Sequence, residues 1–391
     1  MLIIKNANLL SMKDENELKT DIMIKDGKIF KIDNVNENEY SDATIIDAKG
    51  KLVTPGLVDG HCHVGMCEDG IRIEGGDINE MSSPVTPQMR GIDSIKPQDP
   101  AFKEALRSGI TTVVTGPGSA EVIAGTFCAL KTHGKSVLDM CIKEEATMKM
   151  ALGENPKRVF SSKDQCPQTR MGSAALIREN LIKAKKYYEK KQKYLSEIKN
   201  VDAKVIEPEF NMMMESLSRV YDGLKVKIHA HQQDDIVTAI RIAEEFNLDY
   251  SIEHCTEGYL IPEILKEHNV PIIIGPTLGT RTKYELRNKS FDAGKVLIDN
   301  DIKFAIMTDH PVIPLENTLT QAAIYIKHGM TSYQVLKALT INPAEICGIS
   351  DRVGSIEIGK DADIVIWSND PFHYLSKAEV VIVNGEVVVN Q

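Results

Sequence analysis

The chain has 391 residues, 42% of them hydrophobic, so it is long enough to bury a large core in one big domain or two ordinary ones. Its 46 basic and 56 acidic side chains give a formal net charge of −10, which argues against a protein that binds nucleic acid through a cationic surface. The apolar runs are too short to span a membrane, and Met1-Leu-Ile-Ile-Lys-Asn lacks the features of a signal peptide. Seven cysteines without paired spacing predict free thiols in a reducing, cytoplasmic compartment.

Short strands separated by turns are predicted at both ends of the chain. They are Leu2–Leu10, Asp21–Ile24, Lys28–Ile32 and Thr44–Asp47 near the start, and Ala362–Trp367, Glu379–Val383 and Glu386–Val389 near the end. Asn384-Gly385 between the last two strands is a strong hairpin signal. Because the two ends of a domain often lie close together, we expect residues 1–53 and 354–391 to pair into a single small sheet domain.

Residues 54–353 alternate strands with helices instead. The predicted strands are Leu57–Val64, Thr111–Thr115, Thr147–Leu152, Val226–Ala230, Tyr250–Glu253, Ile272–Gly275 and Phe304–Thr308, with helices such as Ile236–Phe246 and Leu319–Lys327 between them. This alternation predicts an α/β fold in which residues 54–353 form a (β/α)8 TIM barrel with insertions. Residues 125–131 and 137–142 fit either its third strand or an inserted hairpin.

Lysine is the commonest residue type between positions 174 and 200, where Ile177, Leu181 and Ala184 recur at helical spacing. This pattern predicts a solvated outer helix rather than a nucleic-acid site.

Asp59-Gly-His61-Cys-His63 is the clearest chemical motif, at the end of the first predicted barrel strand. Alternate residues of a strand share a face, so both imidazoles point the same way at the end of the barrel where active sites are built. Asp59 could accept the outer N–H of a ligand histidine and fix its tautomer. Taken alone, the motif also fits two buried histidines that are satisfied by hydrogen bonds.

Further histidines favour a metal site over a buried hydrogen-bonded pair, since six of the ten histidines fall at predicted strand ends. His229 and His231 end one strand, His254 ends the next, and Asp309 with His310 closes the last. Neutral imidazoles with a carboxylate suit a borderline divalent ion, with zinc the first choice and iron or manganese as alternatives.

The stretch Val53-Thr-Pro-Gly-Leu-Val-Asp-Gly-His-Cys-His resembles the barrel entry of the amidohydrolase superfamily of metal-dependent hydrolases. Leu339-Thr-Ile-Asn-Pro-Ala-Glu and the run that begins at Gly354-Ser-Ile-Glu-Ile-Gly-Lys-Asp-Ala-Asp are similar to the family's exit from barrel to sandwich. The resemblance implies a small β-sandwich domain of residues 1–53 and 354–391 beside a catalytic barrel of residues 54–353. The resemblance covers nearly the whole chain and is closest to the imidazolonepropionase-like and prolidase-like branch.

The resemblance implies one ion held by His61, His63 and Asp309, and a second held by His229 and His254. In two-metal relatives a carboxylated lysine bridges the ions, and Lys149 occupies the matching position. Glu154 is the alternative bridge, because other branches use a glutamate there. A third possibility is a single ion, with Lys149 in a structural ion pair.

Two residues are candidates for contact with substrate. The family pattern leaves His231 free to contact the substrate or polarise its carbonyl group, although an ordinary supporting histidine would fit the same position. Arg281, which follows the seventh strand with Lys283 and Arg287, could bind a substrate carboxylate through its guanidinium fork.

The resulting hypothesis is a hydrolase with about two zinc ions that cleaves a C–N bond in a cyclic amide, N-acyl amino acid or dipeptide, using metal-activated hydroxide. Asp309 would shuttle the proton. The alternatives are a one-metal deaminase, an imidazolonepropionase-type ring hydrolase, and, more remotely, an inactive assembly protein. We expect a small-molecule substrate, no nucleic-acid or membrane partner, and a homo-oligomer as an open possibility.

Overall fold

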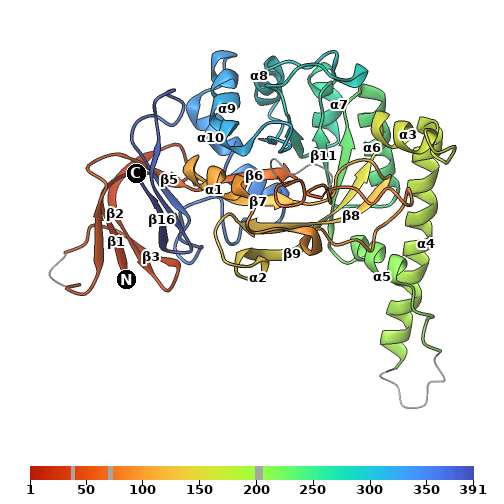
Figure 1. Cartoon of the computed structure of the whole chain (residues 1–391), viewed down its shortest axis with the longest axis horizontal. Helices are drawn as coiled ribbons and strands as arrows, with labels where there is room; N and C mark the ends of the chain where they lie inside the picture. Colours follow the sequence, from red (N-terminus) through yellow and green to blue (C-terminus); the bar gives the residue numbers. More distant parts are fainter. Residues whose placement is uncertain (37–39, 69–73, 199–205) are drawn as a thin grey trace.

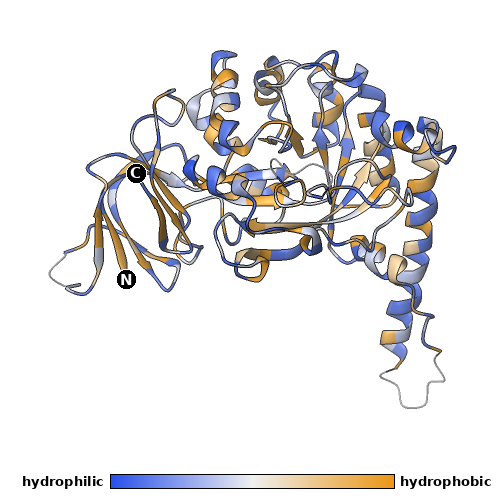
Figure 2. Ribbon diagram, in the orientation of Figure 1, coloured by the Kyte–Doolittle hydropathy of each residue, from blue (hydrophilic) through white to orange (hydrophobic). Residues whose placement is uncertain are grey.

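Figure 1 shows the computed structural model of the chain, in which a sheet built from both ends of the chain lies beside a larger body built around a second sheet. The structure describes residues 1–36, 40–68, 74–198 and 206–391. In Figure 2 the strands of both sheets are coloured mainly as hydrophobic residues, and the helices carry both hydrophobic and hydrophilic residues.

Eight strands from the two ends of the chain form one hydrogen-bonded sheet. They are β1 (Leu2–Leu10), β2 (Glu17–Lys25), β3 (Lys28–Ile32), β4 (Thr44–Asp47), β5 (Leu52–Pro55), β14 (Ile364–Trp367), β15 (Ala378–Val383) and β16 (Glu386–Asn390). The two halves of the chain meet where β5 pairs with β14. Strand pairing therefore joins the two ends of the chain in one sheet with a shared apolar core. The β-sandwich that the resemblance implies stays a prediction. Only Gly56 separates β5 from the first strand of the body, so no linker marks a boundary there. The boundaries at residues 53/54 and 353/354 stay predictions.

The body contains a second eight-stranded sheet whose strands follow one another in chain order. They are β6 (Leu57–Cys62), β7 (Ile110–Thr115), β8 (Ile123–Lys131), β9 (Cys141–Ala151), β10 (Lys225–Ala230), β11 (Tyr250–His254), β12 (Ile272–Ile274) and β13 (Phe304–Ile306). The first and last strands lie next to each other and are linked just beyond β13, where Asp309 N donates to His61 O at 3.2 Å. The sheet is thus a nearly closed barrel.

The third strand departs from the predicted alternation. β8 runs antiparallel to both β7 and β9, whereas the other neighbouring pairs of this sheet are parallel. Only residues 116–122 connect β7 to β8, which is too short for the crossover helix that a parallel connection needs. Residues 137–142 likewise form the short helix α2 (Val137–Met140) and the start of β9 rather than a strand of their own.

The helices lie mainly outside the barrel sheet (Figure 1). Besides α2 they are α1 (Pro100–Arg107), α3 (Glu154–Ser161), α4 (Arg170–Glu197), α5 (Met212–Ser218), α6 (Gln233–Glu245), α7 (Pro262–Glu267), α8 (Asp292–Asp299), α9 (Thr318–Lys327), α10 (Ser332–Ala338) and α11 (Ile341–Ile346). The predicted helices at Ile236–Phe246 and Leu319–Lys327 correspond to α6 and α9.

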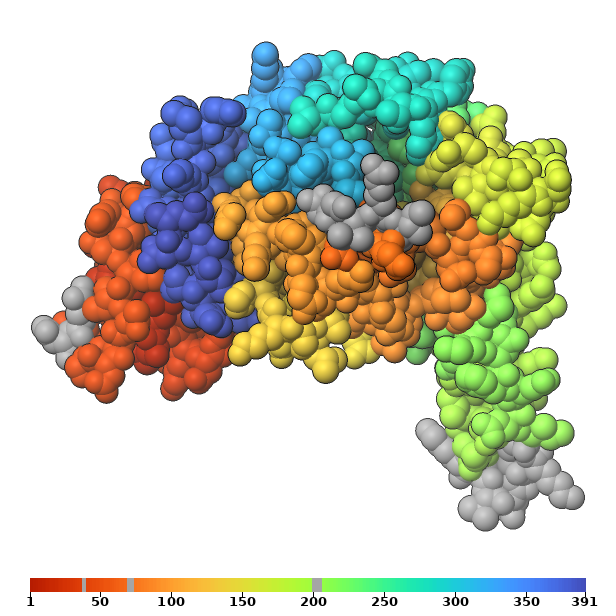
Figure 3. Space-filling model, in the orientation of Figure 1, coloured from red at the N-terminus to blue at the C-terminus, as the bar shows by residue number. Residues whose placement is uncertain are grey.

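The lysine-rich helix α4 projects from the body, at the lower right of Figure 3. It buries Ile177, Leu181 and Ala184 and exposes most of its lysines, as expected of a solvated outer helix. Positions 199 and 200 of the predicted lysine-rich segment lie outside the described residues. In the part of the chain that the structure describes, no helix is both long and apolar enough to cross a membrane.

A buried ion cluster joins the terminal sheet to the barrel. The Lys131 ammonium in β8 lies 2.9 Å from Asp361 Oδ2 and 2.5 Å from Asp363 Oδ2, just ahead of β14. Asp361 also pairs with Arg352 at 2.8 Å. Because the Lys131 side chain is only 1% exposed, these charges depend on one another for compensation.

We expect Lys131→Met to lower the free energy of unfolding by about 3–5 kcal/mol, since it leaves two buried carboxylates with less compensation. The matched control is Lys303→Met, which breaks an exposed pair with Glu345 and should cost about 0–1 kcal/mol. Urea unfolding at neutral pH measures both. Equal costs for the two variants would show that the buried cluster does not stabilise the junction.

Candidate metal centre

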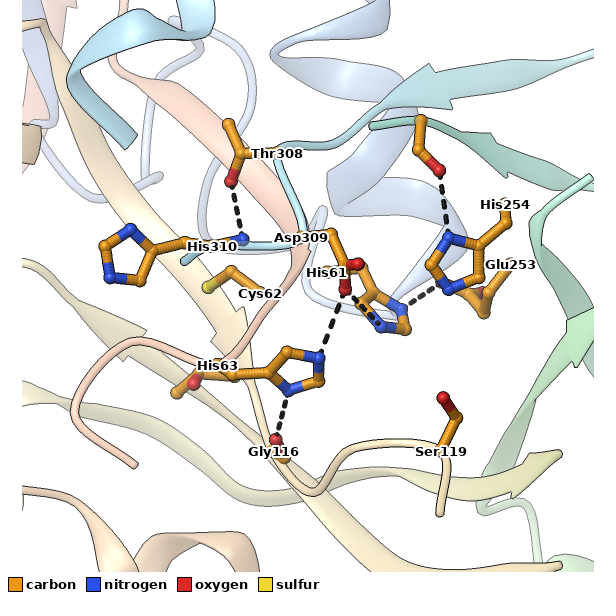
Figure 4. Close-up of polar contacts among 12 residues, drawn as sticks. His61, Cys62, His63, Gly116, Ser119, Glu253, His254, Thr308, Asp309 and His310 are labelled. Carbon is orange, nitrogen blue, oxygen red and sulfur yellow. Dashed lines mark hydrogen bonds and ion pairs between the residues drawn. The ribbon is translucent and has the colours of Figure 1, made fainter. Parts of the chain in front are cut away.

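Three side chains meet at the seam between the first and last barrel strands. His61 and His63 flank the end of β6, and alternation along the chain places their rings on one face, 5.5 Å apart between centroids. Asp309 follows β13 with a positive φ of 55°, and its Oδ1 lies 3.1 Å from His63 Nε2 and 3.7 Å from His61 Nε2 (Figure 4). The structure therefore brings the predicted first ligand group together.

A second group lies beside the first. His229 and His231 come from the end of β10, and His254 ends β11 with a positive φ of 69°. The His254 ring centroid is 4.3 Å from that of His229 and 4.5 Å from that of His231. It is also 5.5 Å from His61, so the two groups are neighbours (Figure 4). The sequence predicted His229 and His254 as ligands, and the structure places His231 within the same group.

Hydrogen bonds to Nδ1 orient three of these rings. His63 Nδ1 donates to the Gly116 carbonyl at 2.7 Å, and His254 Nδ1 donates to the Gly275 carbonyl at 2.9 Å. A ring whose Nδ1 carries the proton has an unprotonated Nε2, which is the form that ligates a metal. His231 Nδ1 contacts the Thr256 hydroxyl at 2.7 Å.

His61 is held by Glu253, and not by Asp59 as the sequence suggested. Glu253 Oε2 accepts from His61 Nδ1 at 2.6 Å and from Lys227 Nζ at 3.0 Å. Asp59 instead accepts from the His61 backbone N–H and from the N–H and hydroxyl of Thr308, so it ties β6 to the last strand. Burial raises the pKa of Asp59 to about 6, although these hydrogen bonds oppose the shift.

His229 gives the test of whether this centre fits a metal ion. The side chain is 2% exposed, and within the part of the chain that the structure describes neither ring nitrogen has a hydrogen-bond partner. A buried polar group without a partner costs free energy, which a ligated ion would recover. Burial also holds the pKa of this histidine well below its usual range, as it does for His61, His231 and His254, so all four stay neutral at pH 7. The donor set suits zinc or a similar divalent ion.

Lys149 points into this centre, and Glu154 does not line the cavity. Lys149 lies within β9, and its Nζ is 3.2 Å from His61 Nε2. Burial lowers the pKa of this lysine to about 8, opposed by the carboxylates of Glu253 and Asp309. Glu154 begins α3, and its backbone N–H donates to Glu285 Oε2.

A cavity of about 700 Å³ opens beside the centre. His63, His229, His231, His254, Lys149 and Asp309 line its floor, and Arg158, Lys283 and Lys289 line its walls. Arg281, predicted to bind a substrate carboxylate, is instead exposed and donates to the backbone carbonyls of Arg287 and Lys289. The guanidinium thus braces its own loop, while two neighbouring lysines face the cavity.

The sequence analysis did not single out Glu253 and Glu285. Glu253 immediately precedes His254 in a strand that reads as apolar, and a charged residue in such a run is a sign of a buried partner. Glu285 lies in the loop after β12, beside the three charged residues that drew attention there, and no local pattern sets it apart.

Comparison with known proteins agrees with this geometry. Residues 52–388 match the Amidohydrolase family, so the chain belongs to that family. A crystal structure of an amidohydrolase from Thermotoga maritima MSB8 is 40% identical, covers 100% of both chains and superposes with a TM-score of 0.94. A Xaa-Pro dipeptidase structure at 18% identity and a TM-score of 0.60, again over 100% of both chains, shares the fold.

Curated relatives point the same way. Amidohydrolase tasK of Hapsidospora irregularis is 30% identical over 372 residues, which are 90% of this chain but only 38% of that protein. Imidazolonepropionase of Bacillus cytotoxicus is 26% identical over 93% of this chain and 88% of its own. The predicted superfamily and branch are confirmed, and the protein is a hydrolase that acts on carbon–nitrogen bonds.

Elemental analysis tests the metal site directly. We expect about two divalent ions per chain, because each of the two donor groups can hold one. His61→Ala should lose the ion of the His61, His63 and Asp309 group. The exposed His133→Ala is the control and should keep the wild-type content. Metal content that is unchanged by His61→Ala would exclude this group as a metal site.

Proposed function

We propose that the protein is a metal-dependent hydrolase of a small molecule, with two zinc ions at the mouth of a (β/α)8 TIM barrel whose third strand is reversed. The observation that carries this proposal is the pair of adjacent donor groups, three side chains each, whose members other than the buried His61 line one cavity. All seven cysteines are free, which supports the expected cytoplasmic location.

A divalent ion, when bound, would lower the pKa of water at the centre to about 7 and polarise the scissile carbonyl. Asp309 is the residue that we assign to proton transfer. Its side chain is 15% exposed and reaches both the cavity and the two histidines of the first group. It would take a proton from the attacking water and deliver it to the leaving nitrogen. His231 has two roles open to it, contact with the substrate carbonyl or metal binding.

The substrate class follows from the cavity. Its volume of about 700 Å³ accommodates a cyclic amide, an N-acyl amino acid or a dipeptide. Arg158, Lys283 and Lys289 on the walls favour a substrate that carries a carboxylate. Relatives named imidazolonepropionase and a fold neighbour named Xaa-Pro dipeptidase fit this class.

The second candidate is a one-ion ring hydrolase or deaminase. Lys149 favours it if the amine stays unmodified, since a cation 3.2 Å from His61 Nε2 would repel a second ion. Carboxylation would instead turn Lys149 into an anionic bridging ligand. The metal content and the state of Lys149 therefore separate the two candidates.

Carboxylation of Lys149 should depend on pH in a defined direction. Only the neutral amine adds carbon dioxide, and a pKa of about 8 makes roughly a tenth of it neutral at pH 7 and roughly nine tenths at pH 9. The neutral amine adds carbon dioxide to form a carbamate and releases a proton, so at fixed dissolved carbon dioxide the ¹³C carbamate signal of metal-free protein should rise by more than tenfold over this range until the site is saturated. Lys149→Met should abolish the signal and Glu154→Gln should keep it. Absence of a carbamate on Lys149 in the wild type, together with loss of bound metal in Glu154→Gln but not in Lys149→Met, would move the bridge to Glu154.

Asp309→Asn tests the proton shuttle. Asparagine keeps the shape and an oxygen ligand but cannot accept the proton, so turnover should fall by about 10²–10⁴-fold while much of the metal stays bound. A panel of N-acyl amino acids, cyclic ureides and dipeptides identifies the substrate first. Asp299→Asn, at an exposed aspartate, is the control. Near wild-type turnover in a metal-loaded Asp309→Asn variant would assign the shuttle to another residue.

A further inference from the structure

Glu285 is a fully buried carboxylate that the mechanism above does not use. It lies in the 3-10 turn η5 (Tyr284–Leu286), in the loop between β12 and α8. Its Oε2 accepts the backbone N–H of Glu154 at 3.0 Å, at the start of α3. Gly153 leaves room for this contact, because a Cβ there would lie 2.8 Å from Glu285 Oε2.

The other oxygen of Glu285 faces the second histidine group. Oε1 is buried and has no hydrogen-bond partner among the described residues, and it lies 3.6 Å from His231 Nε2 and 4.0 Å from His229 Nε2. These distances are too long for hydrogen bonds. They are close to the separation of about 3.4 Å between two ligand atoms of one tetrahedral zinc ion with bonds of about 2.1 Å.

Nitrogen atoms of His229 and an oxygen atom of Glu285, none of which forms a hydrogen bond among the described residues, therefore face one another across a small gap. His229 lacks a partner on both ring nitrogens, and Glu285 lacks one on Oε1. Lys283 Nζ lies 3.5 Å from Oε1 and is the only lysine or arginine among the described residues that forms an ion pair with this carboxylate. The Lys283 side chain is 27% exposed. A divalent ion in the gap would satisfy the histidine and the carboxylate together.

We propose that Glu285 is a metal ligand, which completes a site of three histidines and one carboxylate with His229, His231 and His254. This inference rests on the proposed metal-dependent function and assigns His231 to metal binding. Three neutral imidazoles and one carboxylate supply the four ligands of a tetrahedral zinc site, and the carboxylate offsets part of the charge of the dication. His254 closes the group, since its ligand nitrogen lies within 4.8 Å of those of the other two histidines.

Glu285→Gln separates this role from a purely structural one. The amide oxygen of glutamine can still accept the N–H of Glu154, so the start of α3 keeps its hydrogen bond. Glutamine has lost the anionic oxygen that would bind the ion. A structural role alone therefore leaves metal affinity unchanged, whereas a ligand role lowers it.

Glu257→Gln is the matched control. Glu257 is also buried, and its Oε2 accepts the N–H of Gln233 at the start of α6 at 3.0 Å. Its other oxygen accepts from Asn288 at 2.8 Å and pairs with Arg287, so it has partners that do not include the histidines.

Metal-free wild-type protein and both variants are titrated with Zn²⁺ in competition with a chromogenic chelator. We expect two ions in the wild type and in Glu257→Gln, and a Kd for one ion raised at least tenfold in Glu285→Gln. The second ion should be unaffected. If circular dichroism shows that Glu285→Gln does not fold, Glu285→Asp, which keeps the charge but withdraws the oxygens, is measured with the same expected weakening.

If folded Glu285→Gln binds both Zn²⁺ ions with the same Kd values as the wild type, this inference is overturned and the proposed function still stands. A wild type with one ion that is lost in His61→Ala and retained in Glu285→Gln would also overturn it. Failure of the wild type to bind Zn²⁺ at all would instead contradict the proposed function.

Discussion

The hydrogen bond between Glu253 and His61 inside the barrel is the interaction on which the centre depends. Glu253 Oε2 lies 2.6 Å from His61 Nδ1 and 3.0 Å from Lys227 Nζ, and all three residues are 0% exposed. A buried carboxylate that bonds two neighbours fixes the ring of one and compensates the charge of the other. His61 in turn contacts Lys149 and faces Asp309. Loss of Glu253 would therefore leave two buried lysines with less compensation and one ligand ring without orientation.

The same two stretches of chain close the barrel and position the metal centre. Asp59 in β6 accepts two hydrogen bonds from Thr308, which follows β13, and His63 N donates to the His310 carbonyl at 2.9 Å. His61, His63 and Asp309 thus join the first and last strands through their backbone groups and form the first donor group with their side chains. Because the seam is short, a shift of one strand would displace the ligands on both sides of it.

The reversed third strand also contributes to the cavity. Since β8 runs back from the end of β7, the turn between them lies at the mouth of the barrel. This turn supplies the Gly116 carbonyl that orients His63, and it places Ser119 and Ala120 on the cavity wall (Figure 4). A helical crossover at this point would have carried the chain away from the mouth.

The sequence by itself determined which residues are candidates for metal binding. His61, His63, His229 and His254 are recognisable because each ends an apolar strand, and the ends of parallel barrel strands converge on one mouth. The position of Lys149 could be predicted for the same reason, since a long side chain rooted within a strand reaches the strand's end. The outer face of α4 followed from helical periodicity alone.

Only the tertiary structure decided which side chains meet across the barrel. Glu253 rather than Asp59 holds His61, Lys283 and Lys289 rather than Arg281 line the cavity, and Glu285 faces the second histidine group. Each of these outcomes depends on the direction of a side chain relative to another element. Local periodicity fixes the face of a strand, but the partner on that face depends on register, loop path and closure, and these are set by packing of the whole chain.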